Sequence, residues 1–418
     1  MGGPDEGGRM TGRGRLARTA VAAAALSIAV ALGVSGCSAD LIDSLHQAGH
    51  DVKSHAEAAG KGRALTTGHV APDGSGNACT LTKPCDLATA VARAAPGSTI
   101  RLAGGTYPTT RLAADGAPRL DGADRNATVE PEPGATPVFG ALTTEAPHLT
   151  WTGITVTVQW YLNGGAVGNV VDDVKVDGGG LFVRSSDITV KDSEFMNGSS
   201  IDGIQVGLSN NVLIEGNSVH DYNQDKNDNI HADCIQVFDS SNVTIRGNRL
   251  KNCYNTGLII SVGAGKGIHT LTVESNFIQG CIVVGPRCGG GSSAALQEKS
   301  ATDLVVRGNT FANGSVRLVQ TPGLVFDRNI VGYISSCDAP MTNSIIEFWN
   351  TKMCGTPAVV SRDGNRAVKV AFQDQDAGDL RPADASTVRI SPQGTLGPVA
   401  TDIDGHPMPA DVAGAAAP

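Results

Sequence analysis

A six-residue pattern recurs from residue 149 onward, and its clearest copies read IEGNSV at 214–219, IRGNRL at 245–250 and VRGNTF at 306–311. Successive copies begin 19 to 33 residues apart. Repeats of this length predict short strands, tight turns and occasional longer loops, so that the chain completes one circuit of a coil in each repeat. We therefore expect a coil of parallel strands, stacked about 4.8 Å apart around one continuous apolar core. The remaining copies are LTWTGI (149–154), VDDVKV (171–176), VKDSEF (190–195), VESNFI (273–278) and FDRNIV (326–331).

The fourth position of the repeat is asparagine in five consecutive copies, which predicts a ladder of side-chain amides. Asparagine tolerates the left-handed turn conformation, and its amide can hydrogen-bond the equivalent asparagine above and below. We therefore expect these amides to stack on one another. The column reads Thr152, Val174, Ser193, Asn217, Asn248, Asn276, Asn309 and Asn329.

A short helix is predicted ahead of the repeats, with Asp86 as its N-cap and Pro96-Gly97 as its stop. The segment 98–107 then predicts a strand with a glycine turn. The apolar face of the helix comprises Leu87, Ala90, Val91 and Ala94.

With this helix, the GGTY turn at 104–107 and the repeats, the chain resembles the right-handed parallel β-helix proteins of the pectate-lyase-like superfamily over roughly residues 69 to 350. The tail segments GDLR (378–381) and DIDGHP (402–407) resemble the ends of secreted bacterial β-helix proteins. The resemblance implies an all-β fold: a single-stranded right-handed parallel β-helix, or solenoid, with a short N-terminal capping helix.

The N-terminal segment resembles a bacterial lipoprotein signal. A basic stretch precedes the apolar segment 19–34, which is too short to span a bilayer comfortably, and VSGC at 34–37 resembles a lipobox. The resemblance implies a lipid on Cys37 and an extracytoplasmic protein anchored to the bacterial cell membrane; the alternative is ordinary cleavage and secretion. The expected organisation is a signal peptide (1–36), a flexible tether (37–68), the β-helix (69–354) and a C-terminal extension (355–418).

The net charge narrows the classes of possible binding partner. Without residues 1–36 the chain carries 28 basic and 39 acidic side chains, which argues against a nucleic-acid binder. We expect a monomer with a polysaccharide substrate.

Apart from Cys37 there are eight cysteines, and no CxxC spacing suggests metal ligation. Cys79 with Cys85 and Cys337 with Cys354 would close short loops, whereas the pairing of Cys234, Cys253, Cys281 and Cys288 stays open.

Candidate site residues emerge fifteen positions before the asparagine column, where DGIQ (202–205), DCIQ (233–236) and AALQ (294–297) align. Residues that alternate along a strand face opposite sides, so the three glutamines should point outward on one face, in a row that Ile259 interrupts. His231 lies two residues before Asp233, and Tyr254 takes the corresponding place one turn later. The expected catalytic residues are Asp202, His231, Asp233 and Tyr254, and the expected substrate-binding residues are Gln205, Gln236, Gln297 and Lys299.

This set favours acid/base chemistry on a glycosidic bond. Two aspartates about 5 Å apart do not easily ionise together, so one pKa should rise unless His231 or a cation compensates. Residues 202–245 resemble polygalacturonases through DGI and DCIQ, although Ala232 replaces the first aspartate of the DDC motif. No GHG histidine or RIK motif follows, which argues against the standard inverting mechanism.

We therefore expect cleavage or epimerisation of a uronic-acid-containing polysaccharide, by a lyase-like reaction first and by hydrolysis next. His231 or Tyr254 would act as acid or base, while Gln205, Gln236 or a cation would neutralise the substrate carboxylate. The competing class is a noncatalytic carbohydrate-binding or cell-surface β-helix. In that case Asp202 and Asp233 would cap turns, His231 would simply bond Asp233, and the glutamines would form a solvated amide ladder.

A calcium ion is the expected cofactor. Asp221, Asn223 and Asp225 alternate as the ligands of a Ca²⁺ loop do, although Lys226 replaces the usual glycine. The alternative is a polar surface loop.

Overall fold

The computed structural model describes residues 63–224, 231–263, 265, 267–282, 294–298, 301–337, 340–354 and 363–417. The expected leader, most of the tether, Cys37, Asp225 and Lys299 lie outside these residues. Within them, no helix combines the length and apolar character needed to cross a membrane.

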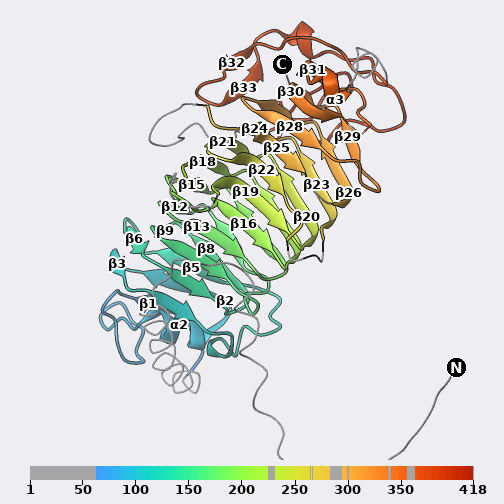
Figure 1. The fold of residues 1–418 in the computed structure, drawn as a ribbon. Helices are drawn as coiled ribbons and strands as arrows, with labels where there is room; N and C mark the ends of the chain where they lie inside the picture. The colour runs from blue at the N-terminus through green and yellow to red at the C-terminus, as the bar shows by residue number, and fades with distance from the viewer. Residues whose placement is uncertain are drawn as a thin grey trace, which may run out of the picture. The chain divides into compact units, whose positions relative to one another are not determined.

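The described chain winds as a coil with three strands in each complete turn, and all strand pairs of the coil are parallel (Figure 1). This confirms the predicted parallel β-helix. The first face is an eleven-stranded sheet. Its strands are β1 (Leu65–Val70), β2 (Ala94–Leu102), β5 (Ala127–Pro131), β8 (Leu149–Thr152), β11 (Val170–Asp172), β14 (Ile188–Lys191), β17 (Asn210–Glu215), β20 (Ser241–Arg246), β23 (His269–Glu274), β26 (Thr302–Arg307) and β29 (Val325–Asp327).

The other two faces belong to one twenty-stranded sheet. The second face contains β3 (Gly105–Tyr107), β6 (Pro137–Phe139), β9 (Thr155–Val156), β12 (Lys175–Asp177), β15 (Glu194–Met196), β18 (Ser218–Tyr222), β21 (Arg249–Cys253), β24 (Phe277–Gln279), β27 (Thr310–Ala312) and β30 (Ile330–Cys337). The third contains β4 (Thr110–Leu112), β7 (Leu142–Thr144), β10 (Gln159–Leu162), β13 (Gly180–Val183), β16 (Ile204–Gly207), β19 (Asp233–Phe238), β22 (Thr256–Ile260), β25 (Ala294–Glu298) and β28 (Ser315–Leu318).

The predicted asparagine ladder is present between the first and second faces. Each amide donates to the next along the coil, from Asn217 to Asn248 at 3.0 Å and from Asn248 to Asn276 at 3.0 Å. The same Oδ1 atoms also accept backbone N–H groups of the preceding rung, as Asn276 does from Asn248 at 2.8 Å. All five asparagines are buried, so the ladder satisfies polar groups that water does not reach. The remaining steps join Asn276 to Asn309 and Asn309 to Asn329.

Two details of the predicted column are wrong. The left-handed conformation belongs to the residue before each ladder position, such as Gly216 (φ 68°) and Ser275 (φ 56°), not to the asparagine. The first copy is also displaced by two residues, because Trp151 pairs with Val171 and Thr152 with Asp172. Ile154, not Thr152, therefore takes the place equivalent to Val174. The large buried Trp151 decides this register, since a core position accepts it and a corner position does not.

A column of alternating charge runs along the end of the first face. Register places one charged residue on each of seven successive strands, with opposite signs on every neighbouring pair. Direct ion pairs include Lys191 with Asp172 at 2.8 Å and Arg246 with Glu215 at 2.6 Å. Exposed pairs of this kind contribute little individually, but like charges directly opposite each other would destabilise the pairing. The column reads Asp172, Lys191, Glu215, Arg246, Glu274, Arg307 and Asp327.

The N-terminal end of the coil carries the capping helix α2 (Leu87–Arg93). Asp86 caps it as predicted, accepting the Thr89 N–H at 2.7 Å, and its predicted apolar face is buried. The helix ends at Arg93, earlier than Pro96-Gly97, because β2 begins at Ala94 and pairs with β1. Strand β1 begins at Leu65, inside the expected tether. The single-turn helix η1 (Ala114–Gly116) follows β4.

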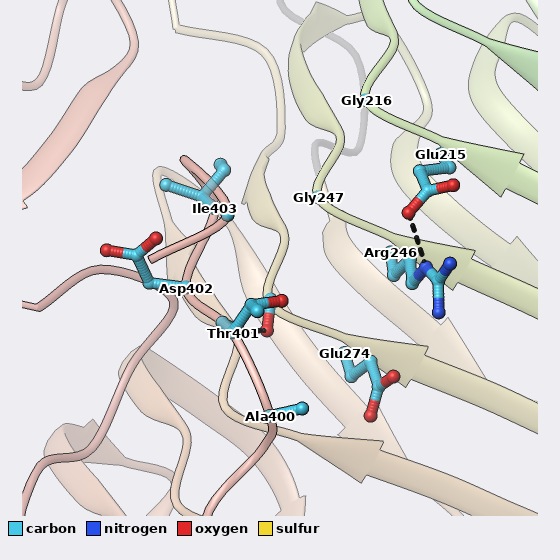
Figure 2. A pocket seen from close by; sticks show the side chains of 11 residues that line it. Glu215, Gly216, Arg246, Gly247, Glu274, Ala400, Thr401, Asp402 and Ile403 are labelled. Carbon is cyan, nitrogen blue, oxygen red and sulfur yellow. Dashed lines mark hydrogen bonds and ion pairs between the residues drawn. The ribbon is translucent and has the colours of Figure 1, made fainter. Parts of the chain in front are cut away.

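The C-terminal segment packs back onto the last rungs, where Figure 1 shows β32 (Phe372–Asp374) and β33 (Asp379–Pro382) beyond β30. Ser275 Oγ donates to the Thr401 carbonyl at 2.6 Å, and Arg249 pairs with Asp404 at 2.9 Å. A crevice of about 140 Å³ remains between residues 400–405 and the first face; Figure 2 shows Glu215 and Arg246 on its strand side. The remaining elements are β31 (Ile345–Trp349), α3 (Thr351–Cys354) and η2 (Ala385–Val388).

Five cysteines outside the leader whose side chains the structure describes are in disulfides, as the sequence allowed. Cys79 and Cys85 form the predicted disulfide, and Cys234 pairs with Cys253. Cys281 is also in a disulfide. The side chains of Cys337 and Cys354 lie outside the described part of the chain.

Replacing a central ladder residue should destabilise the coil. Asn276→Ala removes buried acceptors and donors on both sides, so we expect the free energy of unfolding to fall by about 3 kcal/mol. Denaturant unfolding followed by circular dichroism measures this. The control is Asn210→Ala, an exposed residue whose Oδ1 accepts from Ser241 and Asn242 at 2.8 Å, where we expect a change below about 0.5 kcal/mol. Equal effects of the two substitutions would contradict a supporting role for the ladder.

Candidate functional site

Two buried carboxylates stand at the entrances of successive strands on the third face. Asp202 lies just before β16 and Asp233 begins β19; their exposed fractions are 3% and 0%. Asp202 Oδ1 accepts the Asp233 backbone N–H at 2.9 Å. Asp233 Oδ1 in turn accepts from the Thr256 hydroxyl at 2.6 Å and the Asn255 amide at 2.7 Å. Each carboxylate therefore ties its rung to the next, as the turn-capping alternative expects.

His231 is the member of this group that solvent reaches, with 44% of its side chain exposed. Its Nδ1 lies 2.7 Å from Asp233 Oδ2 and 3.6 Å from Asp202 Oδ1. One ring nitrogen thus forms ion pairs with both carboxylates, and the rest of the ring is available to a ligand. We call Asp202, His231 and Asp233 the carboxylate–histidine cluster.

The electrostatics of the cluster fix the protonation of its histidine. Pairing with Asp202 and Asp233 raises the pKa of His231 to about 10. Burial raises the pKa of Asp202, and the charge of Asp233 acts in the same direction, while the neighbouring His231 opposes both. The imidazole is therefore protonated at neutral pH. It can donate a proton or attract an anion there, but it is not a base until the pH rises above its pKa.

The glutamines form a column beside the cluster. Register places Gln205 next to Gln236, Gln236 next to Ile259, and Ile259 next to Gln297, in the predicted order with the predicted interruption. Gln205 Nε2 donates to Asp202 Oδ2 at 2.8 Å and to Gln236 Oε1 at 2.6 Å. Gln205 therefore connects the cluster to the outward face of the sheet.

Sequence reasoning missed Arg184, which directly follows β13 on the rung before Asp202. Its Nη2 donates to Gln205 Oε1, which fixes the orientation of that carboxamide. Its guanidinium lies 5.7 Å from the ring centroid of Phe182 and 5.1 Å from that of Phe238. Neither the repeat nor a known motif marks these residues. The available signal was an outward-facing aromatic residue, Phe182, in the same column as Gln205.

The other predicted residues are placed less centrally. Tyr254 is half-buried against the hydrophobic core, and among the described residues its hydroxyl has no hydrogen-bond partner. Asp221 binds His220 at 2.7 Å and Asn252 at 2.5 Å through its two oxygens, so its carboxylate is already engaged. The Asn223 backbone bonds Gly198. Lys299 and Asp225 lie outside the described residues.

Among the residues that the structure describes, two groups of side chains bring potential metal ligands within 4.8 Å of one another: the carboxylate–histidine cluster, and Asp402 with Asp404 and His406. In the cluster, the protonated His231 already supplies the positive charge between the carboxylates. In the second group, Asp402 Oδ1 accepts the backbone N–H groups of Asp404 at 3.0 Å and His406 at 2.8 Å. Asp404 is held by Arg249 and Arg381. These contacts account for the second group as a turn that fastens the C-terminal segment.

The protonation of His231 is directly measurable. In NMR titrations of the ring protons, we expect His231 to titrate near pH 10 in the unmodified protein. Asp233→Asn and Asp202→Asn each remove a negative charge beside the ring, so each should lower the pKa of His231 toward 6.5. A ring that titrates near 6.5 in the unmodified protein would contradict this electrostatic account.

Comparisons with known proteins agree with this architecture. Residues 160–311 match the family described as "Right handed beta helix region". A polygalacturonase of Saccharomyces cerevisiae (strain ATCC 204508 / S288c) is 42% identical over 91 residues, which is 21% of this chain and 22% of that protein. The chain therefore matches only about a fifth of that relative.

Similar solved structures include pectate lyase Pel9A, with a TM-score of 0.43 and 14% identity, over 86% of this chain and 91% of that one. A rhamnogalacturonan lyase has a TM-score of 0.35 and 13% identity, over 77% of this chain and 95% of that one. Residues 160–311, which match the right-handed β-helix family, lie within the parallel strand register of the coil, so this part of the chain has the architecture of a right-handed parallel β-helix.

Proposed function

We propose that this protein is an enzyme that acts on a uronic-acid-containing polysaccharide, with His231 as its proton donor. The observation that carries the proposal is the 2.7 Å ion pair between His231 and the buried Asp233. This pair keeps a protonated imidazole at the surface, on a sheet face that also carries the half-buried Gln205 and the buried Gln236. Asp202 and Asp233 are too buried to touch a polymer, so they act through His231.

Elimination is the reaction that we favour. A base removes the proton α to the uronate carboxylate, the bond to the glycosidic oxygen on the β-carbon breaks, and the leaving oxygen takes up a proton. His231 would supply this last proton, and Tyr254, the other predicted acid/base residue, would act as the base. Epimerisation shares the first step but returns a proton to the same carbon from the other side, so the polymer stays uncut.

Hydrolysis is the second candidate, and the similarity to a polygalacturonase over 91 residues favours it. His231 would again protonate the leaving oxygen, while water supplies the new bond. The products separate the two reactions, because elimination creates an unsaturated uronide that absorbs ultraviolet light and hydrolysis does not. Binding without any product would indicate the noncatalytic alternative.

Turnover should depend on His231. On polygalacturonate, we expect His231→Ala to lower kcat by about 10²-fold or more with little change in KM, because a positioned acid contributes rate rather than affinity. The control is His269→Ala, an exposed histidine on β23 of the first face, which should retain full activity. Unchanged turnover in His231→Ala would contradict the proposed role.

The pH profile provides a second prediction. A proton donor is active below its pKa, so kcat/KM should hold through neutral pH and fall as the pH rises through about 10. Rates are measured across pH with a stability check at each point, because the His231 pairing also stabilises the fold less as the imidazole loses its proton. Activity that increases through this range would contradict His231 as the proton donor.

We further propose that the protein is exported and anchored through Cys37. The disulfides Cys79–Cys85 and Cys234–Cys253 support an oxidising compartment. In a bacterial host with lipoprotein processing, the unmodified chain should fractionate with membranes and Cys37→Ala should not. Equal fractionation of both would contradict the anchor.

A further inference from the structure

We propose that Arg184 binds a carboxylate of the polysaccharide, in a subsite that Phe182 and Phe238 flank on the rung before Asp202. The inference rests on the proposed function only in taking an acidic polysaccharide as the ligand. It concerns binding and does not require that His231 transfer a proton.

The guanidinium of Arg184 has unused capacity for an anion. Nη1 donates to the carbonyl oxygens of Val183 at 2.9 Å and Gln205 at 3.0 Å, and Nη2 donates to Gln205 Oε1. Three of its five N–H donors are thus engaged, all by neutral acceptors. Among the residues that the structure describes, no carboxylate lies within ion-pair distance of Arg184. A partly buried cation without a paired anion is unfavourable, and a carboxylate ligand would relieve this.

The electrostatic setting agrees with an unfilled anion subsite. Burial lowers the pKa of Arg184 to about 10, and the nearby Tyr161 and Asp202 oppose this only in part. The guanidinium remains charged at neutral pH. Because it lies in a poorly solvated position, its attraction for a bound carboxylate is stronger than that of a freely exposed arginine.

The Phe238 ring can approach Arg184 because the neighbouring rung carries a glycine, Gly207. Phe238 pairs in register with Gly207, and its ring occupies the space that a Cβ on Gly207 would need. The missing side chain therefore lets the ring lie across the neighbouring rung toward Arg184. The ring of Phe182, two residues before Arg184, also lies close to the guanidinium, with its centroid 5.7 Å away. Aromatic faces hold the guanidinium in place while its edge stays free for hydrogen bonds.

A column of aromatic side chains extends from the subsite in the direction away from the carboxylate–histidine cluster. Tyr161 and Phe182 occupy equivalent outward positions on β10 and β13, and their ring centroids lie 4.8 Å apart with an interplanar angle of 19°. The next position in the same column is Gln205. Apolar rings, a cation and a carboxamide therefore follow one another along successive rungs. This is the sequence of contacts that an extended acidic sugar chain needs, since sugar rings present both apolar faces and carboxylates.

Binding measurements with two probes test the subsite. The full chain carrying His231→Ala, which should turn the probe over about 10²-fold more slowly or less, is titrated by calorimetry with oligogalacturonate and with the carboxyl-reduced, neutral oligomer. Adding Arg184→Gln should weaken oligogalacturonate binding about tenfold or more and leave the neutral oligomer unaffected. Adding Phe182→Ala should weaken both. Gly207→Ala, which displaces the Phe238 ring without removing any contacting group, should weaken oligogalacturonate binding in the same direction.

The matched control is Phe348→Ala, which removes an exposed aromatic ring on β31 and should bind as the parent does. Melting temperatures of all variants exclude general unfolding. Parental affinity in both Arg184→Gln and Gly207→Ala would overturn the subsite, even if the protein cleaves its substrate. Conversely, an Arg184-dependent affinity in a protein that never turns over polygalacturonate would support the subsite and overturn the proposed reaction.

Discussion

The stacking of identical amides inside the coil is the interaction on which the rest of the structure depends. Each asparagine of the ladder accepts a backbone N–H of the preceding rung, and each one except the last, Asn329, donates its amide to the next asparagine. A slip of one residue at any rung would bury these polar groups without partners, at a cost that packing would not recover. The ladder therefore sets the register in which the third face brings Gln205 beside Gln236, and with it the geometry of the carboxylate–histidine cluster.

The same carboxylates, those of Asp202 and Asp233, both support the fold and set the protonation of His231. Asp202 and Asp233 hold successive rungs through Asp233 N–H, Thr256 and Asn255, and they also hold the proton on His231. The two interpretations of the aspartates that the sequence left open are thus compatible. What distinguishes the site from an ordinary turn cap is that the single exposed member carries a positive charge.

The repeat pattern was sufficient to predict the coil, the ladder and the juxtaposition of the glutamines, because strand alternation and a fixed return distance leave little freedom. It failed at the first copy, where LTWTGI offers two similar registers and only the burial of Trp151 decides between them. It also failed for Arg184. The guanidinium is positioned by its hydrogen bond to Gln205 and by the Phe238 ring, which fills the space beside Gly207. Side-chain contacts of this kind do not recur with the repeat, so the repeat pattern does not reveal them.

The alternating column from Asp172 to Asp327 limits how such a chain can change in length. Deleting one complete coil between Glu215 and Glu274 would bring two carboxylates into direct opposition, whereas deleting two neighbouring coils would restore the match. Duplication and loss of rungs during evolution should therefore be tolerated preferentially in even numbers along this part of the molecule. The surface charges therefore restrict changes in the number of coils to even steps, although each charge contributes little to the stability of the solenoid.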